Sequence, residues 1–290
     1  MRFILSFVFM FSACAKAPVD PVRTTELPVV APVKVKTQPG MVRWVRFPVP
    51  VGWESATLQC KDKQLKHAVL EKGVHFAYIA ETYFSDLNTH ACKLKRGTEE
   101  LPVVEFEVTP YEYKKEKLKV DYRKISLSKK DLARAQSEQR MLNELYGKSA
   151  ATPYFSGPFI APLSSMITSV YGTKRVYNNA HRGQHLGTDF RAAVGVPVPA
   201  VNRGRIMFAG DLFYTGGTVI IDHGMDIFTV YGHLSEVKVE AGQIVNSGDI
   251  VALTGNTGRS SGPHLHWGVK IHGDYVDGYS LISETKKQFP

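Results

Sequence analysis

Short alternations of apolar and polar residues run through the segment 41–110. Residues 104–108 (VEFEV) alternate at every position, and residues 56–60 (ATLQC) do so nearly as well. A period of two places one face of a strand in a core and the other in water. Turn-forming residues such as Gly52 and Gly73 separate the runs. The pattern predicts a small antiparallel β-sandwich over residues 41–110.

A helical period appears only in the basic segment that follows, residues 111–150. Its apolar residues recur at helical spacing: Leu132, Ala135, Leu142 and Leu145. Ser128 is a suitable N-cap with Asp131 three residues on, and Gly147 suits the end. We therefore expect a helix over residues 129–146 that links two domains, with its apolar stripe as a packing face. The lysine-rich residues 111–124 are expected to form a solvated connector or an edge strand.

The last segment, residues 151–290, has many glycines and short apolar runs. Residues 204–210, 217–224 and 250–253 read as strands between turns, and no long amphipathic helix is visible. An antiparallel β-sheet domain is expected here. The predicted fold class is therefore all-β with one linking helix.

Residues 1–14 have the features of an export signal. Arg2 supplies a positive charge, and the apolar run over residues 3–11 is too short to span a bilayer as a helix. Signal peptidase could cut after Ala15. Alternatively, Cys14 could become the lipidated first residue of a lipoprotein, because residues 11–14 resemble a lipobox with Phe11 in place of the usual leucine. An uncleaved anchor is the third alternative.

The cysteine count favours lipidation. The chain has three cysteines, and in an exported protein Cys60 and Cys92 can pair, which leaves Cys14 as the odd one. We therefore expect an outer-membrane-anchored lipoprotein of the periplasm. Residues 15–40 are rich in proline and are expected to form an extended tether without regular structure.

Charge narrows the range of partners. The 290 residues carry a formal net charge of +9, which suits anionic partners such as a membrane surface or a cell-wall polymer. The lysines and arginines are scattered, without a long basic run containing interleaved aromatics. Nucleic-acid binding is therefore not expected.

Candidate chemistry gathers in the last third of the chain. His185 and Asp189 are four residues apart, His264 and His266 are two apart, and His233 lies between these pairs. Imidazole and carboxylate groups are zinc ligands, and a catalytic zinc needs three of them with one position open. No His-Glu-x-x-His sequence is present, which excludes a site of the thermolysin type.

The setting of these residues resembles the lysostaphin/LytM-type zinc metallopeptidases of bacterial cell walls. The resemblance runs from about residue 160 to residue 277. It is carried, in order, by residues 169–175 (SVYGTKR), 185–190 (HLGTDF), 195–200 (GVPVPA), 222–224 (DHG), 231–235 (YGHLS), 255–258 (GNTG) and 261–267 (SGPHLHW). Asp277-Gly278 departs from the Asp-Pro that is frequent in relatives, outside the metal motifs.

The resemblance implies roles for the matching residues. His185, Asp189 and His266 would hold one zinc ion per chain, and His233 and His264 would be the catalytic pair. Arg175 and Asn178, in the loop before His185, are expected to bind substrate carboxylates.

The resemblance also implies a LytM-type catalytic domain over residues 151–290. Its expected reaction is hydrolysis of peptide cross-links of peptidoglycan, with the stem peptides as partners and the D-Ala to meso-diaminopimelate bond as the target. The alternative is an inactive wall-binding regulator that activates an amidase, although all five site residues are present. A third hypothesis is an enzyme whose groove is covered by the N-terminal domain.

The remaining histidines are expected to have structural or surface positions. His223 is expected to be structural or at the rim of the groove, and His181 and His272 to be exposed. Ordinary surface or core positions are expected for His67, His75 and His90. The glycine-rich residues 255–262 are interpreted as a mobile wall of the groove rather than a phosphate-binding loop.

Overall fold

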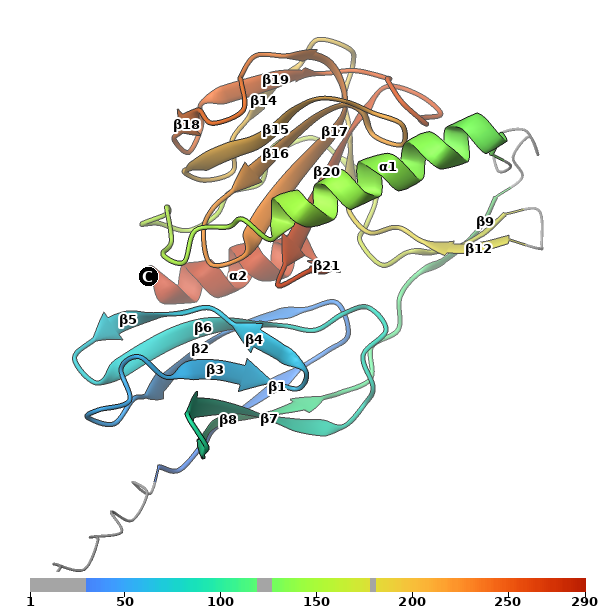
Figure 1. The fold of residues 1–290 in the computed structure, drawn as a ribbon. Helices are drawn as coiled ribbons and strands as arrows, with labels where there is room; N and C mark the ends of the chain where they lie inside the picture. The colour runs from blue at the N-terminus through green and yellow to red at the C-terminus, as the bar shows by residue number, and fades with distance from the viewer. Residues whose placement is uncertain (1–29, 119–126, 178–180) are drawn as a thin grey trace, which may run out of the picture.

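The computed structural model describes residues 30–118, 127–177 and 181–290. Strands are the predominant regular structure in these ranges, together with two helices (Figure 1). The predicted export signal with Cys14, most of the predicted tether, and Asn178 lie outside the described residues. Within the described ranges, neither helix is long and apolar enough to cross a membrane.

Two sheets form the N-terminal half of the molecule, in the lower part of Figure 1. The five-stranded sheet has the order β1 (Val33–Thr37), β8 (Glu99–Val108), β7 (Thr89–Arg96), β3 (Thr57–Cys60) and β4 (Lys63–Leu65). The three-stranded sheet has the order β2 (Val42–Pro48), β6 (Val74–Ala80) and β5 (His67–Glu71). Phe47 and Ile79 of the small sheet share one buried cluster with Leu58 and Leu94 of the large sheet. This packing confirms the predicted small β-sandwich.

Strand β1 corrects the expectation that the proline-rich segment lacks regular structure. Residues 33–37 (VKVKT) pair with β8 in parallel, from Val33 opposite Val104 to Thr37 opposite Val108. The run contains no proline, so each of its backbone N–H groups can donate. Its apolar–polar alternation fits the edge of a sheet with one buried face. The alternation of apolar and polar residues over 33–37 therefore indicates the structure of this run better than the proline-rich composition of the whole segment does.

The predicted disulfide is present within the sandwich. Cys60 on β3 lies directly opposite Cys92 on β7, and their sulfur atoms are bonded at 2.00 Å. The bond closes a loop with a sequence separation of 32 residues. A loop of this length corresponds to a stabilisation of about 3–4 kcal/mol.

The C-terminal half is built on one sheet of ten strands whose pairings are all antiparallel. Its main path runs β10 (Ile167–Ser169), β13 (Thr188–Arg191), β20 (His264–Ile271), β17 (Ile227–Val237), β16 (Gly216–Asp222), β15 (Gly204–Leu212) and β18 (Ile244–Val245). The other three strands are β14 (Pro197–Pro199), β19 (Ile250–Thr254) and β21 (Asp274–Val276). The predicted antiparallel sheet is confirmed.

A small fourth sheet joins the connector to the C-terminal half. Strand β9 (Lys115–Leu118) pairs in parallel with β11 (Lys174–Tyr177), which pairs with β12 (His181–Gln184). Residues 115–118 therefore form an edge strand, one of the two structures expected for this segment.

Helix α1 (Lys129–Tyr146) has the predicted bounds. The Ser128 hydroxyl accepts the N–H of Asp131 at 3.1 Å, and Gly147 is the C-cap. Leu142 and Leu145 pack against the cluster of Ile220, Phe228 and Val230. The C-terminal end of the apolar stripe is thus a packing face, whereas Leu132 at its start is 46% exposed. Helix α1 lies along the C-terminal sheet (Figure 1).

Helix α2 (Gly278–Gln288) was not predicted. Asp277 caps it by accepting the N–H of Tyr279 at 2.9 Å. Figure 1 shows the helix between the C-terminal sheet and the sandwich. Its Leu281 and Ile282 share a buried cluster with Val42 and Tyr78 of the sandwich. Tertiary packing therefore stabilises a short helix that begins with glycine and whose periodicity is weak.

The same contact surface corrects the prediction that His272 is exposed. Only 4% of its side chain is exposed. Its Nε2 lies 3.0 Å from the carbonyl oxygen of Tyr78, which belongs to strand β6 of the sandwich. The burial arises between parts of the chain that are 194 residues apart, so no local pattern indicates it.

His223 is structural, as expected, and its side chain is fully buried. Nδ1 lies 2.9 Å from the carbonyl oxygen of Arg203, and Nε2 lies 2.8 Å from the Thr229 hydroxyl. Burial lowers the pKa of His223 to about 4, against the effect of the Arg203 carbonyl.

This pKa predicts a loss of stability in acid. The unfolded chain binds a proton below pH ~6.5, whereas the folded chain resists it until about pH 4. Stability from this residue is therefore present above pH ~6.5 and is lost as the pH falls towards 4, by about 2 kcal/mol between pH 7 and pH 4.5. Urea unfolding at both pH values should show that the free energy of unfolding falls less between pH 7 and pH 4.5 in His223→Gln than in the unmodified protein. Equal losses would contradict the prediction.

Candidate functional site

Two neighbouring strands bring the candidate residues to one face of the C-terminal sheet. In the pairing of β13 with β20, Asp189 lies opposite His266, and Arg191 lies opposite His264. Residues opposite each other, and residues two apart on one strand, project from the same face. The four side chains therefore share one face, and His185 joins them from the segment that precedes β13.

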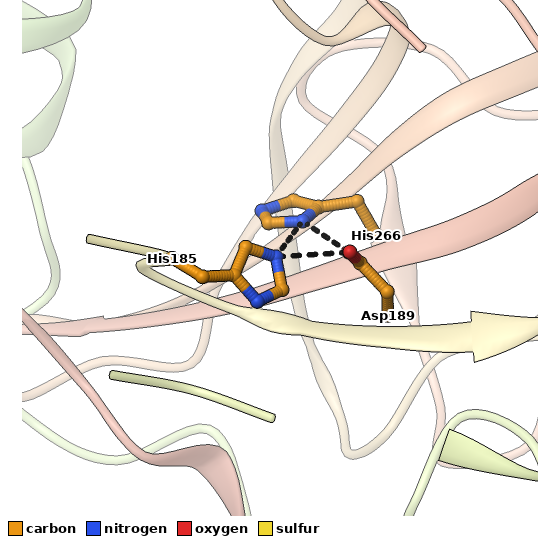
Figure 2. A group of neighbouring side chains, drawn as sticks. All are labelled: His185, Asp189 and His266. Carbon is orange, nitrogen blue, oxygen red and sulfur yellow. Dashed lines mark hydrogen bonds and ion pairs between the residues drawn. The ribbon is translucent and has the colours of Figure 1, made fainter. Parts of the chain in front are cut away.

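His185, Asp189 and His266 point toward one another (Figure 2). Asp189 Oδ1 lies 3.0 Å from His185 Nε2 and 2.9 Å from His266 Nδ1. The two ring nitrogens are 3.3 Å apart. Among the described residues, these three form the one group of histidine, cysteine or acidic side chains whose ligand atoms all lie within 4.8 Å of one another.

The hydrogen-bond partners of His185 are compatible with a bound cation. His185 Nδ1 lies 3.1 Å from the Ser169 hydroxyl and 3.2 Å from the carbonyl oxygen of Val170, which can only accept. A neutral ring that donates to Val170 carries its proton on Nδ1. In this tautomer the Nε2 lone pair faces the Asp189 carboxylate, and a cation bound between the two atoms would remove their mutual repulsion. Ligands about 2.0–2.2 Å from a tetrahedral zinc are roughly 3.4 Å apart. The observed separations of 2.9–3.3 Å are close to that value, so the three side chains fit a zinc ion.

Asp189 is held in its ionised form, as metal ligation requires. Burial alone raises the pKa of Asp189 because it disfavours the charged carboxylate. Hydrogen bonds from His185 and His266, and their charge when protonated, outweigh burial and hold this pKa well below its usual range.

Gly187 leaves room for the His266 ring. A Cβ atom at this position would lie 2.5 Å from His266 Cε1 and 2.8 Å from the Trp267 carbonyl oxygen. Neither the ring nor the backbone could remain in place with any other residue there. The glycine between His185 and Asp189 therefore matters for the geometry of the cluster.

His233 and His264 stand beside the cluster with their ring centroids 4.6 Å apart. His233 Nδ1 lies 2.8 Å from the carbonyl oxygen of Thr257, and His264 Nδ1 lies 2.8 Å from that of Gly262. Because a carbonyl only accepts, both neutral rings carry the proton on Nδ1 and leave Nε2 as an acceptor. His264 Nε2 is 3.6 Å from Asp189 Oδ1.

The environment of His233 keeps its ring neutral. Burial lowers the pKa of His233 to about 4, and the Thr257 carbonyl opposes that change. At neutral pH the ring can therefore accept a proton at Nε2.

A cavity of about 1000 Å³ opens over these side chains. All five candidate residues line it, together with Arg175. Its wall includes residues 258–262, part of the glycine-rich segment expected there.

Arg175 lies on strand β11 rather than in a loop, and its side chain is hydrogen-bonded within the protein. Its guanidinium donates to the Ser169 hydroxyl at 2.8 Å and lies 3.5 Å from Asp189 Oδ2. Its role in binding substrate stays a prediction. The same holds for Asn178, which lies outside the described residues.

Several groups that line the site or orient its side chains were not predicted from the sequence. The carbonyl oxygens of Val170, Thr257 and Gly262 orient the histidines. Backbone acceptors have no sequence signature of their own, although all three lie in segments that carry the family resemblance. Glu116 and Leu127 of the connector also line the cavity.

Three converging ligand side chains beside two histidines with free Nε2 atoms form the donor set of a mononuclear metal hydrolase. Residues 183–278 match the model of Peptidase family M23. This part of the C-terminal unit is therefore an M23 peptidase domain, which confirms the family resemblance.

Two curated relatives come from Vibrio cholerae. The peptidoglycan DD-endopeptidase ShyA is 38% identical over 112 residues, covering 38% of this chain and 26% of ShyA. The peptidoglycan DD-endopeptidase ShyB is 36% identical over 132 residues, covering 42% of this chain and 31% of ShyB. The matches thus span less than a third of the length of either relative.

One solved structure resembles most of the chain. A putative peptidase M23 from Pseudomonas aeruginosa superposes with a TM-score of 0.65 over 85% of this chain and 95% of its own, at 24% identity. The likeness includes the N-terminal half and supports the fold as a whole.

Proposed function

We propose that this protein is a zinc-dependent endopeptidase that hydrolyses peptide cross-links of peptidoglycan, at the D-Ala to meso-diaminopimelate bond. The observation that carries the proposal is the convergence of His185, Asp189 and His266 beside His233 and His264 within the cavity of an M23 domain. The names of ShyA and ShyB support peptidoglycan as the substrate class.

In this proposal, the three clustered side chains hold one zinc ion. Bound zinc lowers the pKa of a coordinated water to about 7 and polarises a carbonyl oxygen. His233 and His264 take up, hold and return protons at their Nε2 atoms, because the carbonyls of Thr257 and Gly262 fix the opposite side of each ring. The protonated rings would then stabilise negative charge that develops on the substrate carbonyl.

The geometry gives less support to the two alternatives. An inactive regulator of an amidase has no need of converged ligands or oriented catalytic histidines, and all five residues are in position here. Covering of the groove by the sandwich is also not supported, because no described residue of the segment 41–110 lines the cavity.

We also propose that the protein is exported to the periplasm and anchored to the outer membrane through Cys14, with residues 15–40 acting largely as a tether. The Cys60–Cys92 disulfide supports an oxidising compartment. Within this arrangement, residues 41–110 and 151–290 are proposed as separate domains joined by the connector 111–150.

The proposal is tested by incubating the purified protein with cross-linked muropeptide dimers and identifying the products by mass spectrometry. We expect conversion to monomers through hydrolysis of the D-Ala to diaminopimelate bond. A chelator should stop the reaction and added Zn²⁺ should restore it. Failure of the zinc-loaded protein to cleave any dimer would sink the proposal, and stimulation of a purified amidase instead would favour the regulator.

A further inference from the structure

Arg191 occupies a distinct position at the candidate site. It lies on β13, two residues after Asp189, and directly opposite His264 on β20. Its side chain therefore projects from the face that carries the metal cluster. The residue is exposed and lines the same cavity.

The other charged groups around the cavity have protein partners. Arg175 is hydrogen-bonded to Ser169. Glu116 forms an ion pair with Lys114 at 3.1 Å. Asp189 faces His185 and His266. By contrast, no acidic side chain in the described part of the chain pairs with the guanidinium of Arg191.

A guanidinium that is exposed at a peptide-cleaving site suits a substrate carboxylate. Its planar donors match the two oxygens of a carboxylate, and it remains charged at every physiological pH. Successive residues on a strand are about 3.3 Å apart, so the Arg191 backbone lies roughly 7 Å along β13 from Asp189. That separation suits a group next to the scissile bond rather than a distant part of the substrate.

The proposed substrate has a carboxylate at that position. Diaminopimelate has two amino-acid centres, and in the cross-link one of them supplies the nitrogen of the scissile amide. The carbon that bears this nitrogen also bears a free carboxylate. A cross-link with a carboxamide at this centre has the same shape without the charge.

We propose that Arg191 binds the carboxylate on the carbon attached to the scissile nitrogen, and thereby determines specificity for unamidated diaminopimelate cross-links. The inference rests on the proposed function. It gives Arg191 a role in substrate selection, distinct from the metal ligands and from the two catalytic histidines.

The test compares two synthetic muropeptide dimers, which differ only in a carboxylate or a carboxamide at that centre. The unmodified protein is expected to cleave the carboxylate dimer with a kcat/KM roughly 10- to 100-fold higher, as is typical of a hydrogen bond between charged groups. In Arg191→Gln this preference should vanish, because cleavage of the carboxylate dimer falls much further than that of the carboxamide dimer. Arg191→Lys should retain part of the preference.

A matched control is Arg140→Gln, which makes the same change in net charge on the exposed face of α1, away from the cavity. It should retain the full preference. Equal losses on both dimers in Arg191→Gln would indicate a structural role, and an unchanged preference would exclude contact with the carboxylate; either result overturns the inference. Failure of the unmodified protein to cleave either dimer would instead contradict the proposed function.

Discussion

Asp189→Ala is expected to release zinc from the protein and to lower cleavage of muropeptide dimers by at least about a hundredfold. Protein zinc sites of four ligands bind with about 10–16 kcal/mol, so one ligand contributes roughly 3–4 kcal/mol. That loss corresponds to about 10²- to 10³-fold in affinity. Asp189 is also the centre of the cluster, since both ring nitrogens lie within 3.0 Å of its Oδ1.

Metal content measured by mass spectrometry, together with dimer cleavage, checks this prediction. Asp62→Ala is a suitable control because it removes an exposed carboxylate from the turn between β3 and β4, far along the chain from the site. The control should retain both zinc and activity. If Asp189→Ala retained a full complement of zinc and normal cleavage, Asp189 could not be a ligand. Circular dichroism would establish that the variant is folded.

The sequence predicted those elements whose signal is local. The sequence of helix α1 contains an N-cap residue, a terminating glycine and apolar residues at helical spacing within twenty residues, and the predicted bounds agree with the structure. Residues 104–108 of β8 alternate clearly, whereas β6 is buried at five consecutive positions; both sheets of the sandwich are present. The pair His264 and His266 could be placed on one face of a strand because a period of two requires it.

Elements that depend on distant contacts could not be predicted in the same way. Helix α2 is stabilised by Leu281 and Ile282 packing against residues more than 200 positions earlier. The burial of His272 has the same origin. Strand β1 was concealed by neighbouring prolines, although its own five residues alternate.

The candidate site combines features that local sequence predicts with features that depend on distant contacts. Family motifs indicated which side chains to expect, but the register of β13 against β20 is what brings Asp189 and His266 to 2.9 Å across 77 residues of chain. The carbonyl groups that orient the histidines, and the commitment of Arg175 to Ser169, are consequences of that packing. The sequence therefore predicts which side chains form the site more readily than it predicts their tautomers and hydrogen-bond partners, which determine their chemistry.

His264→Ala is expected to lower kcat by about 10²- to 10⁴-fold while leaving the zinc content unchanged. The range is that of a lost general acid or base. His264 lies outside the group of mutually close ligand atoms, and its Nε2 is 3.6 Å from Asp189 Oδ1. Its removal should therefore spare the metal, in contrast to Asp189→Ala. Steady-state cleavage of muropeptide dimers and metal analysis of the same sample provide the measurement.

For the second histidine of the pair, asparagine is the better replacement. His233 has a φ of 62°, which asparagine tolerates more readily than alanine, so His233→Asn separates loss of the imidazole from backbone strain. It should lower kcat to a similar extent with zinc retained, and His90→Ala on β7 serves as a control that removes an imidazole elsewhere. Parallel loss of zinc and activity in His264→Ala would make that residue a ligand. Normal turnover in both variants would show that neither ring transfers a proton in the rate-limiting step.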